Sequence, residues 1–196
     1  MIRWAVTGPA GAGKSALCDL LAHKGAAIVD ADRLGHEILA GEDIISNIIA
    51  EFGSGIVRNG SVDRAALGSL VFDDPVALEK LNGITHGPLA ALAGRKLDEL
   101  EKEGRHSLAV LEAAVYFLLP PVPGIELVIT VTASVSMRLH RLTIDGVLSP
   151  GEARSRIEAQ RILEDGWARA DVVLANDGPV SELETAATAL WARLED

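Results

Sequence analysis

The chain has 196 residues, which suits one domain of ordinary size or a core with one inserted subdomain. Its formal net charge of −10 argues against a general nucleic-acid binder, because such proteins need a broad basic face, although a few Lys and Arg residues in one cleft can still hold a phosphate. The single cysteine, Cys18, excludes an internal disulfide, and no apolar run approaches the roughly 18 residues of a membrane span.

These features predict a cytoplasmic protein with no signal peptide and no nucleic-acid or membrane partner, either a monomer or a weak oligomer. Cys18 falls within an apolar helical pattern, so a buried structural thiol is favoured over a reactive one.

The first elements alternate between strand and helix. The pattern predicts a buried strand at 3–7, a helix at 14–23 closed by Gly25, and a second strand at 27–29 that stops at Asp30. A strand, glycine loop, helix and strand in this order indicate a βαβ unit and hence a parallel sheet.

The stretch 32–103 is predicted to be mostly helical. Asn59-Gly60 marks a turn, and Ser61 and Asp63 offer N-caps for a helix that ends at Phe72.

Two more helices are predicted in this stretch. Asp74-Pro75 pairs a cap with proline at the first helical position, and that helix is expected to end near Ile84. Gly87-Pro88 is predicted to break the helical pattern before a further helix at 89–103. A long helical stretch between strands suggests an inserted substrate lobe.

Strands then resume at 108–112 and 127–132, and Pro120, Pro121 and Pro123 fill the connection between them. Helices are predicted next at 134–143 and about 150–163, followed by a fifth strand at 171–175 and a last helix at about 180–194. Ser134 is the expected cap of the first of these helices, and Ser149 with Glu152 forms a capping box for the second. Together, these elements predict a three-layer α/β fold with a five-stranded parallel sheet and helices on both faces.

The segment from Gly8 to Ser15 reads Gly-Pro-Ala-Gly-Ala-Gly-Lys-Ser and fits G-x-x-x-x-G-K-[ST]. Glycines let the backbone turn several N–H groups toward one point, and the following helix adds its positive N-terminal end. The chemistry assigns Lys14 to the β- and γ-phosphates and the Ser15 hydroxyl to Mg²⁺. The phosphate contacts are expected from Gly8, Gly11, Ala12, Gly13, Lys14, Ser15 and Ala16. The alternative is a glycine-rich turn without a ligand, but the strand before it and the helix after it favour nucleotide binding.

Three carboxylates follow strand ends, where ligands collect in an open parallel sheet. Asp30 and Asp32 lie at the end of the second strand, and one of them could simply cap the next helix. A carboxylate at this place, Asp32 in particular, could instead accept a proton from an attacking hydroxyl or help to hold Mg²⁺ through water. Glu112 ends the third strand of the sheet, and it is either a solvated charge or an acid that holds Mg²⁺ through water.

Arg138 and Arg141 lie three residues apart on one helix and therefore share a face. Such a pair can clamp phosphates during transfer, although two arginines on a helix are more often solvated.

Several blocks of the sequence, taken in order and spacing, resemble the dephospho-coenzyme A kinase family along nearly the whole chain. They are Thr7 to Ser15, Val29-Asp30-Ala31-Asp32, Phe52-Gly53, Gly60 to Arg64 with Leu67 and Phe72, Leu81 to His86, Arg156-Ile157, Gln160, Ala170-Asp171 and Asn176. The resemblance implies transfer of the γ-phosphoryl group of ATP, with Mg²⁺, to the ribose 3′-hydroxyl of dephospho-coenzyme A, giving coenzyme A and ADP.

The same resemblance implies one P-loop kinase domain over residues 1–196. Its core would be about 1–31 and 105–196, its helical acceptor-binding lobe about 32–104, and its helical lid about 138–165.

Roles for single residues also follow from the resemblance. Asp32 is the implied general base, Lys14 stabilises the transferring phosphoryl group, and Arg141 stands where the family places a phosphate-binding arginine of the lid. Arg138 and Asn176 are expected at the nucleotide, the latter near the adenine. The acceptor is expected to meet Asp30, Asp32, Arg64 and His86.

The chain also departs from the family pattern at three places. Gly87 separates His86 from Pro88 where the family has His-Pro, and the stretch 113–119 lacks the proline and glutamate of Pro-Leu-Leu-x-Glu. No base stands at 142–146, where the family's lid carries a second arginine, and its loss could weaken charge stabilisation in the transition state. These departures leave two alternatives open: a kinase for another nucleoside or nucleotide, and a nucleotide-binding regulator with weak catalysis.

Overall fold

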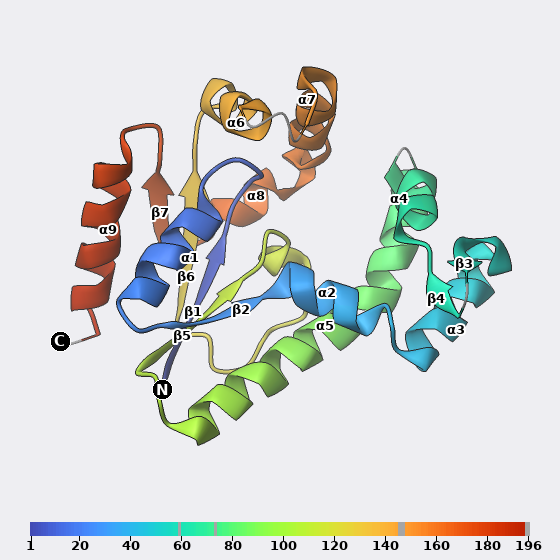
Figure 1. Cartoon of the computed structure of the whole chain (residues 1–196), viewed down its shortest axis with the longest axis horizontal. Helices are drawn as coiled ribbons and strands as arrows, with labels where there is room; N and C mark the ends of the chain where they lie inside the picture. Colours follow the sequence, from blue (N-terminus) through green and yellow to red (C-terminus); the bar gives the residue numbers. More distant parts are fainter. Residues whose placement is uncertain (59, 73, 145–147, 195–196) are drawn as a thin grey trace. The chain divides into compact units, whose positions relative to one another are not determined.

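The computed structural model describes residues 1–58, 60–72, 74–144 and 148–194, and it divides into two compact units (Figure 1). The first unit comprises Met1–Asp30, Lys96–Leu118 and Pro123–Asp196, and the second comprises Ala31–Arg95 and Leu119–Val122. Each unit is built around a hydrophobic cluster of its own.

A five-stranded sheet forms the centre of the first unit, in the order β2-β5-β1-β6-β7, and every neighbouring pair is parallel. Its strands are β1 (Ile2–Thr7), β2 (Ala27–Asp30), β5 (Leu108–Glu112), β6 (Leu127–Thr132) and β7 (Val172–Ala175). The predicted five-stranded parallel sheet is confirmed. The crossovers that parallel strands require explain why helices separate most of these strands in the chain. Strands β5 and β6 are joined instead by a segment with the 3₁₀ turn η2 (Tyr116–Leu118).

Two helices, α1 (Lys14–His23) and α9 (Val180–Ala192), cover one face of the sheet (Figure 1). Alternate strand residues point toward them because side chains alternate across a strand. The cluster on this face includes Trp4, Val6, Leu17, Cys18, Leu21, Val110, Ile129, Val131, Leu183 and Leu190. Cys18 is buried there as predicted, and burial together with the nearby Glu112 carboxylate raises the pKa of its thiol, so the sulfur is unreactive.

The opposite face of the sheet is covered by the end of α5 and by α8 (Glu164–Trp167). Arg3 of β1 is buried and donates to Asp98 at 2.9 Å and Glu101 at 2.5 Å, while Thr130 of β6 donates to the Trp167 carbonyl oxygen at 3.0 Å. With helices on both faces, the first unit is the three-layer α/β fold expected from the sequence.

Helices α6 (Val135–Thr143) and α7 (Pro150–Ala159) begin at the N-caps that the sequence predicts. The Ser134 hydroxyl accepts from the Met137 N–H at 3.3 Å, and Ser149 and Glu152 form a reciprocal capping box. Helix α7 ends at Ala159, and the 3₁₀ turn η3 (Arg161–Leu163) completes the stretch that we expected to be one helix. Residues 145–147, within the predicted lid and the stretch without a second arginine, lie outside the described residues.

The second unit is mainly helical. It contains α2 (Ala31–Ile38), α3 (Glu42–Phe52), the turn η1 (Ser54–Ile56), α4 (Arg64–Phe72) and the first part of α5 (Pro75–Glu103). Asp63 accepts from the Ala66 N–H at 3.0 Å and Asp74 from the Val76 N–H at 2.9 Å, which confirms both as caps. A short antiparallel pair, β3 (Val57–Arg58) and β4 (Ser61–Val62), was not predicted; Asn59 of the predicted turn lies outside the described residues.

Helix α5 corrects one prediction. The sequence indicated a break at Gly87-Pro88, but the helix runs from Pro75 to Glu103 with Pro88 inside it. A proline in a helix interior removes one backbone hydrogen bond and costs about 3 kcal/mol. The residues that follow are buried, namely Leu89, Ala90, Leu92, Ala93 and Leu97, and burial of large apolar side chains at about 1.5–3 kcal/mol each offsets that cost.

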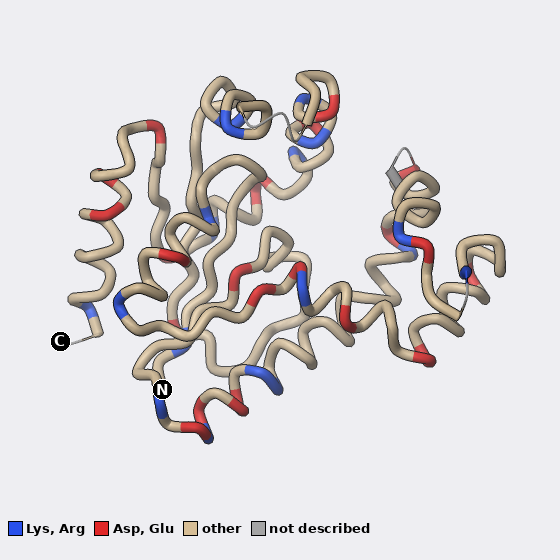
Figure 2. Tube along the Cα trace, viewed as in Figure 1, with Lys and Arg blue, Asp and Glu red and all other residues tan. Residues whose placement is uncertain are grey.

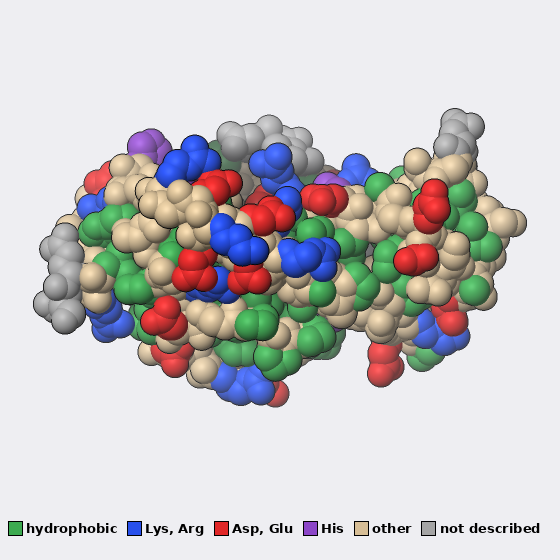
Figure 3. All heavy atoms as spheres, turned by 90° about the horizontal axis from the view of Figure 1, so that it is seen from below, with side chains coloured by type: hydrophobic (Ala, Val, Ile, Leu, Met, Phe, Trp, Pro, Cys, Tyr) green, Lys and Arg blue, Asp and Glu red, His purple; other side chains and the backbone are tan. Residues whose placement is uncertain are grey.

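Acidic residues recur along the trace of both units (Figure 2), and Figure 3 shows acidic and basic side chains interspersed on the face that it draws. Among the described residues, no helix combines the length and the apolar character needed to cross a membrane.

Candidate active site

The loop between β1 and α1 contains three glycines in backbone conformations that would be strained for any other residue. Gly8, Gly11 and Gly13 have φ values of +133°, +75° and +104°, a region that L side chains rarely adopt. A Cβ on Gly8 would lie 2.1 Å from the Val131 carbonyl oxygen, so β6 lies directly against the loop. The loop leads into the N-terminus of α1, where free N–H groups and the helix dipole favour an anion such as a phosphate.

The side chains that follow the loop face the carboxyl end of β5. Ser15 Oγ donates to Glu112 Oε1 at 2.7 Å, and Lys14 Nζ donates to the Pro9 carbonyl oxygen at 3.2 Å. Glu112 is the last residue of β5 and pairs in register with Val6 of β1 and Asp30 of β2. The Ser15 hydroxyl, the Lys14 ammonium group and two acidic residues, Asp30 and Glu112, therefore lie at the carboxyl ends of adjacent strands or on the loop that follows one of them.

Two side chains from the C-terminal half of the first unit hold the apex of the loop. Arg138 of α6 donates through Nε to the Ala10 carbonyl oxygen at 3.0 Å, and the Ala10 N–H donates to Gln160 Oε1 at 2.7 Å. Both backbone polar groups of Ala10 are thus bound by side chains more than 120 residues away in sequence.

The next turn of the loop is held by Arg141 and Asn176. Arg141 Nη1 donates to the Ala12 carbonyl oxygen at 3.2 Å, and Asn176 Nδ2 donates to the same oxygen at 2.8 Å. Arg141 Nη2 also donates to the Asn176 carbonyl oxygen at 2.8 Å. A Cβ on Gly13 would lie 2.3 Å from Asn176 Nδ2, so this glycine is required for the contact.

Arg138 differs from the solvated arginine that is usual on a helix. It is only 5% exposed, and among the described side chains its Nη2 is the one fully buried nitrogen or oxygen without a hydrogen-bond partner. Burial lowers the pKa of its guanidinium group, although arginine keeps its charge in proteins. A buried cation behind the phosphate loop adds positive potential where a nucleotide's charge would lie.

The structure brings most of the predicted nucleotide-binding residues together around one loop: Gly8, Gly11, Ala12, Gly13, Lys14, Ser15, Arg138, Arg141 and Asn176, with Glu112 beside Ser15 and Ala16 next along α1. Three predicted acceptor residues belong to the second unit: Asp32 is the second residue of α2, Arg64 the first of α4, and His86 lies in α5. Asp30, at the end of β2, belongs to the first unit.

Gln160 was not assigned to the site from the sequence. A glutamine after a helix has no characteristic chemistry, and its only signal was its place in a block that resembles the kinase family. Its contact with Ala10 depends on how α7 packs, which no local pattern encodes.

A parallel sheet whose first strand leads into a glycine loop, with Lys14 and Ser15 at the start of a helix, defines a P-loop nucleotide-binding fold. A family model described as dephospho-CoA kinase matches residues 3–182. The dephospho-CoA kinase of Streptomyces avermitilis is 36% identical over 99% of this chain and 94% of its own length, and that of Geobacter sulfurreducens is 35% identical over 96% of each. The crystal structure of TT1252 from Thermus thermophilus has a TM-score of 0.75 and 32% identity, covering 98% of this chain and 97% of its own. The chain belongs to the dephospho-CoA kinase family.

Proposed function

We propose that this enzyme transfers the γ-phosphoryl group of ATP to the ribose 3′-hydroxyl of dephospho-CoA, giving CoA and ADP. The observation that carries the proposal is the loop Gly8–Ser15, whose glycine conformations, Lys14 and Ser15–Glu112 contact form a phosphate site at the carboxyl ends of β1 and β5. The family to which the chain belongs supplies the acceptor.

The donor's phosphates bind the N–H groups of the loop and the N-terminus of α1. Lys14 gives up its contact with the Pro9 carbonyl oxygen and binds the β- and γ-phosphates. Arg141 lies against the same loop and adds positive charge as negative charge moves onto the leaving ADP. Asn176, bonded to both Ala12 and Arg141, positions this side of the site for the adenine.

Ser15 and Glu112 fit a Mg²⁺ ion, because both offer hard oxygen donors and Mg²⁺ is usually held by one or two protein oxygens together with substrate phosphates. Ser15 would hold the ion directly, and Glu112 would hold it through water. When bound, the ion neutralises charge on the β- and γ-phosphate oxygens. No cluster of three or more His, Cys, Asp or Glu side chains suited to a metal occurs in the described part of the chain, which agrees with an ion completed by substrate.

Asp32 serves as general base on the acceptor. Its carboxylate takes the proton of the 3′-hydroxyl while that oxygen bonds to the γ-phosphorus, and the bond from this phosphorus to the β–γ bridging oxygen breaks to release ADP. Asp30, Arg64 and His86 bind the acceptor.

The test is ADP release from Mg²⁺-ATP with and without dephospho-CoA, combined with mass detection of the product. The expected result is ADP release that depends on dephospho-CoA and a product heavier by one phosphate, with Lys14→Ala as the inactive control. A panel of other nucleosides and nucleotides is run beside it. Turnover of a panel member in place of dephospho-CoA, or ATP binding without turnover of any acceptor, would refute the proposal.

A further inference from the structure

Gln160 contacts the phosphate loop, but no step of the proposed reaction uses it. Its Oε1 atom accepts from the Ala10 N–H at 2.7 Å. Because a backbone N–H can only donate, the atom that faces it must be the amide oxygen, and the Nε2 group with its two hydrogens must point away from that N–H. In the described part of the chain, Nε2 has no hydrogen-bond partner. Gln160 therefore holds the loop with one end of its amide and keeps a donor for a ligand at the other.

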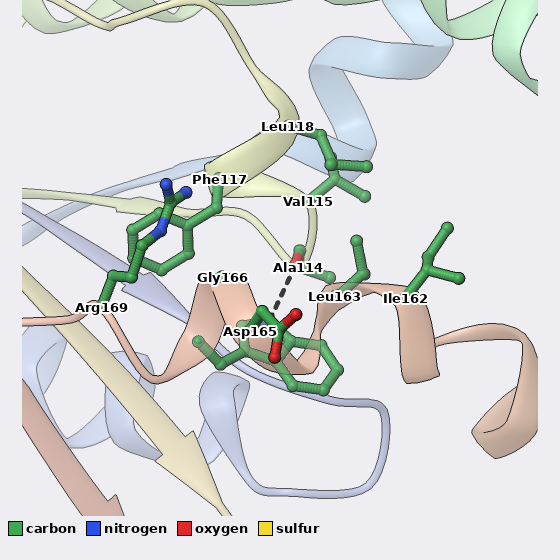
Figure 4. A pocket seen from close by; sticks show the side chains of 10 residues that line it. Ala114, Val115, Phe117, Leu118, Ile162, Leu163, Asp165, Gly166 and Arg169 are labelled. Atoms are coloured by element: carbon green, nitrogen blue, oxygen red, sulfur yellow. Dashed lines mark hydrogen bonds between the residues drawn. The ribbon is translucent and has the colours of Figure 1, made fainter.

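The backbone of Gln160 is fixed on both sides, so its side chain is not a free surface group. Its N–H donates to the Ile157 carbonyl oxygen at 3.3 Å, and its carbonyl oxygen accepts from the Leu163 N–H at 3.0 Å. Both of these neighbours are buried, and Leu163 lines a cavity beside the segment that follows β5 (Figure 4). The dashed line in Figure 4 is the hydrogen bond from Trp167 Nε1 of α8 to the Ala114 carbonyl oxygen, 3.4 Å long, which ties the same chain segment to the end of the sheet. Packing therefore sets where the Gln160 amide lies.

The peptide group that Gln160 holds lies at the end of the loop where the γ-phosphate is expected. Lys14 Nζ donates to the Pro9 carbonyl oxygen at 3.2 Å, and this carbonyl belongs to the same peptide group as the Ala10 N–H. Lys14 is the residue that reaches the β- and γ-phosphates, whereas backbone N–H groups along the loop cradle the α- and β-phosphates. Among the donor's phosphates, the third is thus the one expected nearest to the Gln160 amide.

The side chains around Ala10 have more hydrogen-bond donors than the protein has acceptors for them. Arg138 donates through Nε to the Ala10 carbonyl oxygen at 3.0 Å, and its buried Nη2 atom has no partner among the described residues. With Gln160 Nε2, two donors beside the loop are unused. Buried polar groups in folded proteins are nearly always hydrogen-bonded, so this surplus of donors indicates a ligand rich in acceptor oxygens, such as a phosphate.

We propose that Gln160 binds the γ-phosphate of ATP, an assignment that rests on the proposed function. Oε1 keeps the Ala10 N–H, and Nε2 donates to a non-bridging oxygen of the γ-phosphoryl group. No bond to that oxygen forms or breaks during the transfer, so the amide orients the group and exchanges no proton with it. ADP lacks this oxygen. Gln160 therefore distinguishes the donor ATP from the product ADP.

The decisive variant is Gln160→Glu, which keeps an acceptor for the Ala10 N–H but replaces the donor with a negatively charged oxygen. We expect calorimetry with Mg²⁺ to show ATP binding at least about tenfold weaker, because repulsion replaces a hydrogen bond to a charged group. ADP should bind nearly as it does to the wild type. With dephospho-CoA as acceptor, kcat should fall at least about tenfold, because a donor to the transferring group is lost.

Two further variants separate this role from a purely structural one. Gln160→Met removes both hydrogen bonds at similar length, and Ser155→Glu adds the same charge at an exposed position of α7, where neither nucleotide affinity should change. If Gln160 only holds the loop, Gln160→Met weakens ATP and ADP equally and Gln160→Glu restores both, which would overturn the assignment. If the assignment is right, Gln160→Glu binds ATP more weakly than Gln160→Met does. The titrations contain no acceptor, so wild-type turnover of dephospho-CoA, measured separately, shows any failure of the proposed function.

Discussion

Asp32 follows β2 by two residues, and the loss of its charge tests the assignment of the general base. We expect Asp32→Asn to lower kcat by about 10² or more with ATP affinity nearly intact, since a general base contributes about 10²–10⁴-fold. Single-turnover kinetics and ATP titration would measure the two quantities. Asp43→Asn, at the start of α3, is the control that should retain full activity. Near-normal turnover of Asp32→Asn would remove this residue from the role.

Arg138 holds the loop from behind and is expected to act on nucleotide affinity. Arg138→Met keeps most of the side-chain volume but leaves the Ala10 carbonyl oxygen without its donor. A hydrogen bond from a charged group contributes about 1.5–3 kcal/mol, so ATP binding should weaken at least about tenfold by calorimetry. Arg154→Met, on an exposed position of α7, should bind ATP normally. Unchanged ATP affinity in Arg138→Met would mean that the loop holds its shape without this contact.

The phosphate loop and the side chains that hold it show how much of the site could be predicted from the sequence. The loop was predictable because Gly8, Gly13, Lys14 and Ser15 must stand at fixed short spacings in the chain to build a phosphate site. The contact between Ala10 and Gln160 spans 150 residues and depends on packing that no short pattern encodes.

Among the secondary-structure elements, those with strong local signals were predicted and those decided by packing were not. Helices α6 and α7 start where Ser134 and Ser149 cap them, because a cap is a local hydrogen bond. The pair β3–β4 has only two residues in each strand, too few for a visible alternation. Helix α5 passes through Pro88 because buried residues on its later turns outweigh a local penalty.

Pro88 therefore offers a test at the level of the helix. Its side chain is exposed, so Pro88→Ala loses little packing and restores a backbone donor within α5. We expect urea titrations to show that the free energy of unfolding rises by about 1–3 kcal/mol. The upper limit is the full cost of a proline in a helix interior, about 3 kcal/mol. Gly83→Ala, in the same helix with open space around the new Cβ, should add about 0.5–1 kcal/mol and serves as reference. A loss of stability in Pro88→Ala would indicate that the protein requires the proline's geometry.

For the molecule as a whole, the response to acid depends on the charges that join β1 to the end of α5. The Met1 ammonium group, at 3.1 Å, and then the buried Arg3 guanidinium hold the pKa of Glu101 below its usual range. A carboxyl whose pKa is lower in the folded state stabilises the fold above its unfolded pKa of about 4.3, and this contribution disappears as the pH falls through the folded pKa.

Glu101→Gln removes that contribution at every pH. We expect the variant to have a lower Tm than the wild type at pH 7, and the difference between them to shrink as the pH falls below about 4.3. Glu99, two residues away on α5, forms a surface ion pair with Lys96 at 3.1 Å, so Glu99→Gln should leave the pH profile of Tm close to that of the wild type. A Tm difference between Glu101→Gln and wild type that stays constant from pH 7 to pH 3 would show that Glu101 acts through packing, because a purely electrostatic contribution must vanish once the carboxyl is protonated in both states.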